Sequence, residues 1–116
     1  MSVAMSGMPQ IGGLNDRVQL QRRTVTAEDE GGHAVLYVPL MTLWARVKAV
    51  GGARGVAADG RGVEMTHTLV IRHRSGVFSG DRFLYRGRHL EVLSAEDISG
   101  RKKFLACRCV ERQVTG

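Results

Sequence analysis

The sequence has little of several things that enzymes, membrane proteins and secreted proteins usually depend on. Aromatic residues make up 5% of the 116 residues, and there are two prolines, two cysteines and three lysines. No apolar run approaches the roughly 20 residues that a membrane-spanning helix requires. Residues 1–13 lack both the charged start and the apolar block of a secretion signal. We therefore expect no membrane contact and a protein that is made in the cytoplasm.

The two cysteines, Cys107 and Cys109, are separated by one residue. Side chains two apart on a strand point to the same face about 7 Å apart, which disfavours a disulfide. A structural zinc site needs four ligands with turn-like spacing, and two thiols on a strand do not supply them. His67 and His73, if they share a strand, lie about 20 Å apart. We expect both thiols to be reduced and in or near the core, and no metal or other cofactor.

No recognisable catalytic motif is present. The sequence contains no Gly-x-Ser-x-Gly, Walker A or His-Glu-x-x-His pattern. Three neighbouring acids, Glu28, Asp29 and Glu30, fall in a turn where solvation accounts for them, and Glu91 and Glu111 stand alone on strands. We therefore expect no catalytic residues and no enzymatic activity.

What the sequence has in excess is positive charge. It contains 17 lysines and arginines against 11 aspartates and glutamates, which gives a formal net charge of +6. This balance suits contact with a polyanion such as DNA or with an acidic protein surface, and charge alone does not separate the two.

The remaining pattern is that of short strands joined by turns. Alternating polar and apolar residues recur at short spacing, and no segment has the period of a good helix. The expected strands are residues 16–23, 34–38, 42–50, 66–74, 82–85, 89–93 and 103–111. This pattern predicts an all-β fold, a small antiparallel β-barrel or sandwich, as a single domain over residues 14–116. Residues 1–13 are small and uncharged and are expected to form a flexible tail.

Turn signals separate these strands. Residues 28–32 are rich in acid and Gly, and residues 86–88 contain the Gly that closes a hairpin. Pro39 either interrupts the second strand or marks a bend at a sheet edge, because proline cannot donate to a ladder.

A Gly-rich segment, residues 51–62, interrupts the strand pattern. Five of its twelve residues are Gly, and an unstructured loop of this length is usually functional or disordered. We expect a long loop that contacts a partner. Its candidate residues are Gly51, Gly52, Arg54, Gly55, Asp59, Gly60, Arg61 and Gly62.

Arginines and a single tryptophan supply the other candidate sites. If residues 66–74 and 82–93 form neighbouring strands, five arginines form one basic surface that is either solvated or faces DNA or an acidic partner. These are Arg72, Arg74, Arg82, Arg86 and Arg88. Trp44 is either a core residue or an interface anchor.

Six short segments stand out by their order and spacing. They are the alternating strand at 14–21, the acidic Gly turn at 29–32, Leu-Trp-Ala-Arg-Val at 43–47, the Thr-His strand at 64–72, the aromatic-x-Gly-Arg hairpin at 82–88 and Leu-Ala-Cys at 105–107. In this order they resemble the phage head–tail joining family, the small head-completion or stopper proteins of siphophage-like necks. The Gly-rich segment departs from that pattern, because relatives often carry a more helix-prone stretch there.

The resemblance implies a small barrel that assembles into a ring of about twelve copies in the neck of a phage, a prophage-derived particle or a gene transfer agent. It implies a portal-bound adaptor protein above the ring, a tail terminator or tail tube protein below it, and double-stranded DNA in the channel. The ring then links head to tail and helps to retain or gate the DNA. Residues 51–63 then project toward the channel or a neighbouring ring, where Arg54 and Arg61 meet phosphates or acidic residues.

One alternative comes from a different class of function. A small basic β-barrel that binds nucleic acid outside any particle fits the same charge and strand pattern. Sequence-specific readout is not expected in that case, because no recognition helix is evident. Steeply salt-dependent DNA binding by the isolated monomer distinguishes this alternative from a connector.

Overall fold

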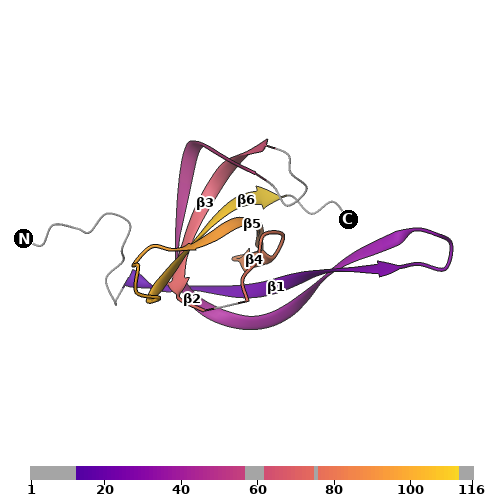
Figure 1. Ribbon diagram of the computed structural model, residues 1–116, viewed down its shortest axis with the longest axis horizontal. Coiled ribbons are helices and arrows are strands. Elements are labelled where there is room, and N and C mark those ends of the chain that lie inside the picture. The colour runs from indigo at the N-terminus through magenta and orange to yellow at the C-terminus, as the bar shows by residue number, and fades with distance from the viewer. Residues whose placement is uncertain (1–12, 57–61, 75, 113–116) are drawn as a thin grey trace, which may run out of the picture.

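The computed structural model describes residues 13–56, 62–74 and 76–112, and the expected tail lies almost entirely outside these residues. The described chain forms β1 (Asp16–Ala27), β2 (His33–Val56), β3 (Gly62–Arg72), β4 (Arg82–Tyr85), β5 (Arg88–Asp97) and β6 (Phe104–Arg112). All neighbouring strands are antiparallel, and the order β1-β2-β3-β6-β5-β4 closes into a barrel (Figure 1). The prediction of an all-β antiparallel barrel is confirmed.

The barrel closes where the short strand β4 pairs with β1. Residues 19–21 of β1 pair with residues 82–84 of β4, and β4 pairs on its other side with β5. Alternate residues of the strands point inward, which is the period expected of a sheet with one buried face. The largest fully buried side chains are Val18, Leu20, Leu69, Ile71, Phe83, Leu90, Val92, Cys107 and Cys109. The core is therefore mostly aliphatic, as the low aromatic content requires.

β2 is one continuous strand of 24 residues where the sequence pattern predicts two strands and the start of a loop. Pro39 does not interrupt it. The register shifts there, because Leu20 pairs with Met41 and Gln21 pairs with Pro39, so Leu40 is the extra residue of a β-bulge. β2 pairs with β3 only from Ala45 onward, so Pro39 lies on an edge, where proline is tolerated in a sheet.

Half of the Gly-rich segment is strand and not loop. Residues 51–56 belong to β2, and residues 53–56 pair with residues 62–65 of β3. Between Ala49 and Ala53 the register shifts, and the residues set aside include Gly51 and Gly52; glycines inside a strand typically mark such a bulge. The expected long loop is therefore corrected to a strand extension, while Asp59, Gly60 and Arg61 lie outside the described residues.

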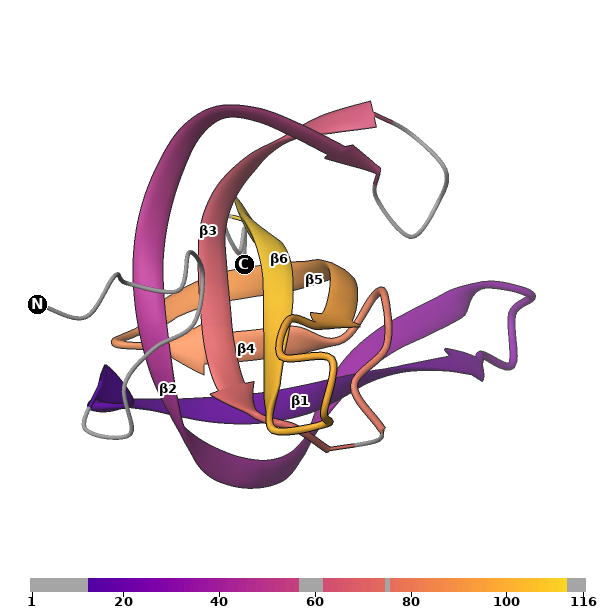
Figure 2. The same cartoon turned by 60° about the vertical axis from the view of Figure 1, so that its left-hand side comes forward.

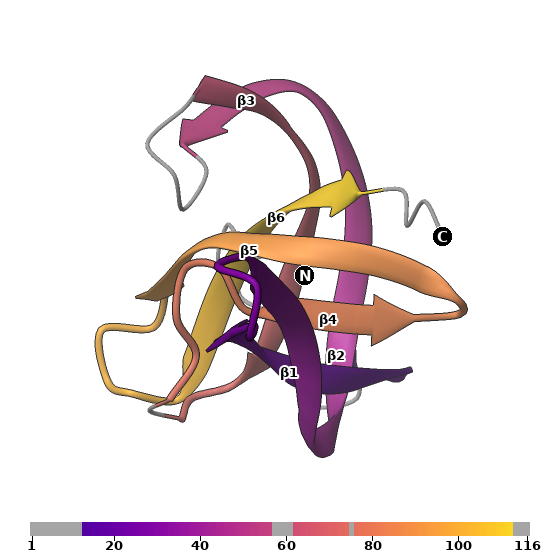
Figure 3. The ribbon, with the colours of Figure 1, turned by 90° about the vertical axis from the view of Figure 1, so that its right-hand side faces the viewer.

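The extended β2–β3 hairpin gives the barrel its shape at one end. Figure 2 shows β2 and β3 curving together past the ends of the other strands. Figure 3, which looks along the β1–β2 hairpin toward the barrel, shows the same pair rising above β4, β5 and β6. The Gly-rich segment therefore belongs to a projecting hairpin and not to the barrel wall.

The β4–β5 hairpin confirms the expected turn. Arg86 and Gly87 have φ angles of 50° and 78°. Positive φ at both central residues is typical of a type I′ turn, whose twist matches that of the flanking strands. Arg86 is one of two described non-Gly residues in this conformation, the other being Lys102.

The β1–β2 hairpin extends beyond the barrel. β4 pairs with β1 only through Gln21, and β3 pairs with β2 only from Ala45, so residues 22–38 form a two-stranded ribbon. Figure 1 shows this ribbon projecting from the barrel on the side away from the start of β1. Its turn is closed by the amide of Glu28, which donates to the carbonyl of Gly32 at 2.8 Å. We call residues 22–38 the arm.

Candidate assembly interface

The arm exposes aliphatic side chains on both faces. Val25 pairs directly with Val35 across the ribbon, and these side chains are 51% and 46% exposed. Leu36 and Val38, which alternate with Val35 and so lie on the opposite face, are 57% and 43% exposed. Neither face of the arm is covered by the barrel.

Each strand of the arm also has an outer backbone edge that pairs with no described strand. After Gln21, β1 has β2 on one side and no described strand on the other, and β2 before Ala45 is in the same position. The two strands of the arm pair with each other, and the Thr24 hydroxyl adds a side-chain bond by donating to the Leu36 carbonyl at 3.2 Å. A two-stranded hairpin is marginal in water, and an exposed edge readily pairs with another chain. The arm therefore has the properties of a contact surface.

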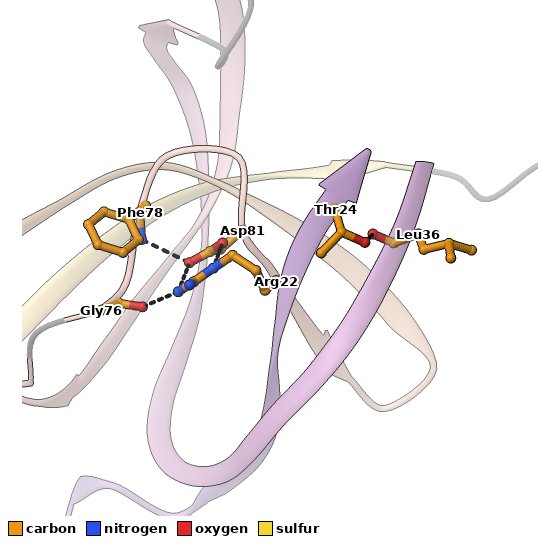
Figure 4. A network of polar contacts seen from close by, with 6 residues as sticks. All are labelled: Arg22, Thr24, Leu36, Gly76, Phe78 and Asp81. Carbon is orange, nitrogen blue, oxygen red and sulfur yellow. Dashed lines mark hydrogen bonds and ion pairs between the residues drawn. The ribbon is translucent and has the colours of Figure 1, made fainter. Parts of the chain in front are cut away.

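An ion pair between the half-buried Arg22 and the buried Asp81 fixes the root of the arm to the barrel (Figure 4). Arg22 Nε donates to Asp81 Oδ1 at 2.7 Å and its Nη2 donates to Oδ2 at 3.2 Å. Nη2 also donates to the Gly76 carbonyl, and the guanidinium lies 5.0 Å from the Phe78 ring centroid. Asp81 is 2% exposed and also accepts from the Phe78 amide at 2.9 Å. The bidentate geometry sets the direction in which the arm leaves the barrel.

A second contact holds the other face of the arm root. The Arg82 guanidinium lies 3.7 Å from the Tyr37 ring centroid, and its Nε donates to Gln21 Oε1 at 2.8 Å. Burial lowers the pKa of Arg82, while the neighbouring Tyr37 raises it. Because this guanidinium is engaged with the arm, Arg82 acts as a support within the chain.

The tip of the arm is acidic. Glu28, Asp29 and Glu30 are all exposed, and no side-chain hydrogen bond or ion pair to any described residue engages them. Every other acid whose side chain the structure describes binds a group of the chain itself. These acids are Asp16, Asp81, Glu91, Glu96, Asp97 and Glu111. The arm tip is thus the place where negative charge is left without an internal partner.

At the far end of the same two strands lies a basic surface that includes the only tryptophan. Trp44 is 53% exposed, and the Arg17 guanidinium stacks 4.5 Å from its ring centroid. Arg46 and Lys48 follow at alternate positions of β2 and are exposed. Trp44 and Arg72 line an open pocket of ≈ 270 Å³ together with residues 14 and 15. We call Arg17, Trp44, Arg46, Lys48 and Arg72 the Trp44 surface.

The exposure of Trp44 excludes the core alternative for this side chain. Its side chain is not in the core, because the adjacent Ala45 is the fully buried residue of that part of β2. Exposed tryptophans that stack with arginine are frequent anchors of protein interfaces. The interface alternative is the one that the exposure of Trp44 supports.

The strand order separates the arginines that were expected to form one surface. β6 lies between β3 and β5, so the expected neighbouring strands do not adjoin. Arg88 is engaged by Glu111, with contacts of 2.6 and 2.9 Å, and this pair raises the pKa of Arg88. Arg74 is half-buried, and Arg86 stacks on Tyr85 at 5.2 Å. Of the five arginines, Arg72 alone joins the Trp44 surface.

The two cysteines and His67 are buried and serve packing. Burial raises the pKa of the Cys107 thiol to about 12, and that of Cys109 is raised well above its usual value for the same reason. His67 is buried, with its Nδ1 2.8 Å from the Thr66 hydroxyl, and burial lowers its pKa. His73 lies just beyond β3.

No group of three or more His, Cys, Asp or Glu side chains in residues 13–56, 62–74 and 76–112 is placed to hold a metal ion. No helix in the described part of the chain is long and apolar enough to cross a membrane.

The sequence pattern alone did not identify the arm as a site. Residues 34–38 and 16–23 were recognised as strands, but nothing in their alternation shows that the barrel ends at Gln21. The available signal was the pairing of aliphatic residues on both faces of a hairpin that ends in three acids. A strand with one buried and one solvated face alternates apolar and polar residues more strictly than the strands of the arm do.

The comparison with family models gives a match over nearly the whole chain. A family model described as phage head completion protein matches residues 9–112. No curated protein matches the chain.

Among the solved structures that share the fold, two illustrate the likeness. One is a chain in a structure of the virion of a native gene transfer agent particle, with 23% identity and a TM-score of 0.60 over 88% of this chain and 94% of that one. The other is the solution structure of protein SF1141 from Shigella flexneri 2a, with 24% identity and a TM-score of 0.65 over 89% of this chain and 96% of that one. At these identities the likeness establishes the fold.

Proposed function

The chain belongs to the phage head completion protein family, and from this membership we propose that it joins head to tail in the neck of a tailed phage or phage-like particle. It forms a ring of its own copies between a portal-bound adaptor and a tail terminator or tail tube protein. The ring surrounds the DNA and helps to retain it. The shared fold with a chain in a gene transfer agent virion supports a place in such a particle.

The observation that carries this proposal is the arm. A free monomer exposes Val25, Val35, Leu36 and Val38 on a two-stranded ribbon that the barrel does not cover. Exposed apolar surface on a projecting element is typical of a protein that works inside an assembly. A connector needs such surfaces, whereas a soluble binding domain does not.

The β2–β3 hairpin is the proposed contact to DNA. Its sequence carries Arg54 and Arg61, whose charges suit phosphate groups in a channel. Replacing both by alanine (R54A/R61A) is expected to leave assembly intact and to reduce the fraction of heads that keep their DNA. DNA retention at the wild-type level in this variant would show that this hairpin does not hold the DNA in the channel.

The experiment that tests the function is electron microscopy of particles from cells that lack this chain. The expected result is separate, emptied heads beside free tails, with tailed particles restored by complementation with the wild-type chain. Intact, filled and tailed particles in the deletion strain would show that the chain is not a connector.

A second candidate function rests on the net charge of +6. A basic barrel that binds nucleic acid outside any particle would bind DNA as an isolated monomer, with an affinity that falls steeply with salt. Tight, salt-dependent binding together with intact particles in the deletion strain favours this candidate. Neither candidate involves catalysis, and we propose no enzymatic activity.

A further inference from the structure

The arm and the Trp44 surface have opposite chemistry. The arm ends in three exposed acids that have no partner among the described residues, and it carries aliphatic side chains behind them. The Trp44 surface carries four cations, none of which is in an ion pair within the described part of the chain, around an exposed indole and an open pocket. The arm offers negative charge and aliphatic side chains, and the Trp44 surface offers positive charge and an exposed aromatic ring.

These two surfaces cannot meet within one molecule. Arg17 pairs with Trp44 near the start of β1, whereas Ala27 at the end of β1 pairs with His33 beside the acidic turn. Ten residues separate Arg17 from Ala27, and a strand rises about 3.3 Å per residue, so the surfaces lie about 33 Å apart. Figure 1 shows β1 running from one end of the molecule to the other without turning back. Any contact between them joins two copies.

We propose that the arm of one copy docks on the Trp44 surface of the next copy. The acidic turn at residues 28–30 meets Arg17, Arg46, Lys48 and Arg72, and the aliphatic side chains behind it cover Trp44 and its pocket. The proposal rests on the proposed function, because it names the surfaces through which the ring forms. The occupant is a second copy of this chain and not DNA, because DNA offers no aliphatic side chains for Trp44 and is repelled by the arm tip.

The geometry of this contact matches a ring. Because two different surfaces meet, the interface is heterologous, and each copy has one arm to give and one surface to receive. Such head-to-tail contacts close into rings when the rotation between copies permits, and otherwise form open filaments. The Arg22–Asp81 ion pair fixes the direction of the arm, so it controls the rotation between copies.

Cross-linking in assembled particles tests the contact directly. Thr26 in the arm and Thr42 beside the Trp44 surface are both exposed, and neither belongs to the proposed contact, so T26C/T42C is expected to fold and to assemble. The native thiols are buried and do not compete for the reagent. Treatment of purified particles with a flexible bismaleimide is expected to give a ladder of this chain on a denaturing gel. The single variants T26C and T42C are expected to give no ladder.

The outcomes separate this proposal from the proposed function. Absence of the chain from purified particles overturns the proposed function. Presence of the chain in filled, tailed particles without a ladder, or with a cross-link to another protein or to DNA, overturns the docking proposal alone. A ladder in the double variant with none in either single variant supports both.

A charge exchange gives a second, independent test. The arm variant E28K/D29K/E30K and the surface variant R17E/R46E/K48E each place like charges opposite one another in the proposed contact. Each is expected to lower the yield of filled, tailed particles roughly tenfold or more. The chain that carries both sets restores opposite charges and is expected to recover most of the yield. No recovery in the combined chain, with each variant folded by circular dichroism, overturns the proposal.

Discussion

His67 and His89 are held in surroundings that disfavour their charged forms. His67 is buried beside Arg88, and burial followed by that cation lowers its pKa. The pKa of His89 is lowered by burial and by Arg82, and its Nδ1 has no hydrogen-bond partner among the described residues. Both side chains are therefore neutral in the folded barrel at neutral pH.

These histidines predict a pH dependence of folding. Their folded pKa values lie below the unfolded value of about 6.5, so the unfolded chain binds more protons as the pH falls. The stabilisation is complete above that value and is lost as the pH falls below it. We expect the free energy of unfolding, measured by urea denaturation, to be smaller at pH 5 than at pH 7.5.

Removal of the titrating groups is the control for this pH dependence. The double variant H67Q/H89Q is expected to unfold with a smaller change in free energy between pH 5 and 7.5 than the wild type. An equal change in both proteins would assign the effect to other groups. Glu111, whose pKa is lowered by its hydrogen bond to Arg88, titrates below this range.

At the residue scale, the sequence was informative about the core and less so about the surface. The expectation that Cys107 and Cys109 lie in or near the core is confirmed, because inward positions of a barrel follow the period of the strand. The role of Trp44 stayed open, because an outward position carries no local signal of what covers it. The three acids at the arm tip were attributed to solvation, since their lack of an internal partner is visible only in three dimensions.

At the scale of single elements, the direction of the arm depends on one ion pair. Asp81 is 2% exposed and is neutralised by Arg22, which connects β1 to the segment before β4. R22A leaves a buried carboxylate without its cation, and we expect a loss of about 1–3 kcal/mol in the free energy of unfolding. Urea denaturation followed by circular dichroism measures this loss.

Arg23 provides the matched control for this substitution. It is the next residue on β1, it is exposed, and it lies on the opposite face of the arm. R23A is expected to change the free energy of unfolding by no more than about 0.5 kcal/mol. If R22A and R23A have equal effects, the ion pair does not hold the arm.

The type I′ turn predicts that replacing Gly87 by alanine lowers the free energy of unfolding. Its φ is 78°, and a Cβ added there meets nothing within 4 Å, so the cost of G87A is one of backbone conformation alone. We expect a loss of about 1 kcal/mol. G32A, in the arm turn, has equal space and no positive φ, and it is expected to be neutral or slightly stabilising. Denaturation curves of the two variants compare them, and a destabilised G32A beside an unchanged G87A contradicts the assignment.

The strands and turns were predicted well where residues close together in the sequence determine the structure. Both short hairpin turns and the last strand follow from turn residues and alternation, which act over a few positions. β2 was divided into two strands and a loop, because Pro39 and the Gly-rich segment are strong local breakers. Pairing with β1 and β3 overrides both signals through bulges, and a single sequence without its partners does not reveal this.

The whole molecule combines a closed barrel with two hairpins that project from it. The barrel satisfies its own backbone and buries its own core, whereas the arm leaves aliphatic side chains, its outer edges and the acids at its tip without a partner among the described residues. The resemblance and the family match agree on the kind of assembly, and the exposed surfaces suggest how copies meet. Neither the order of the strands around the barrel nor the separation of the arm from the Trp44 surface follows from local sequence signals.

In a heterologous ring each copy must give one arm and receive another. A chain with one defective surface is therefore expected to inhibit ring assembly when it is present together with wild-type chains. A variant in which residues 23–37 are replaced by a short Asn-Gly turn keeps the barrel and the Trp44 surface but cannot reach the next copy. It accepts the arm of a wild-type chain and leaves the ring open at that point. We expect its co-expression with the wild type to reduce the yield of filled, tailed particles, counted by electron microscopy.

The control is a chain that is defective at both surfaces. The same arm replacement combined with R17E/R46E/K48E can neither give nor receive a contact, so it is excluded from the ring and is expected to leave the yield unchanged. Equal inhibition by the two chains would mean that inhibition does not depend on the Trp44 surface, and the head-to-tail contact would be wrong. Inhibition by the first chain alone requires that this surface receives an arm, because the two chains differ at no other position.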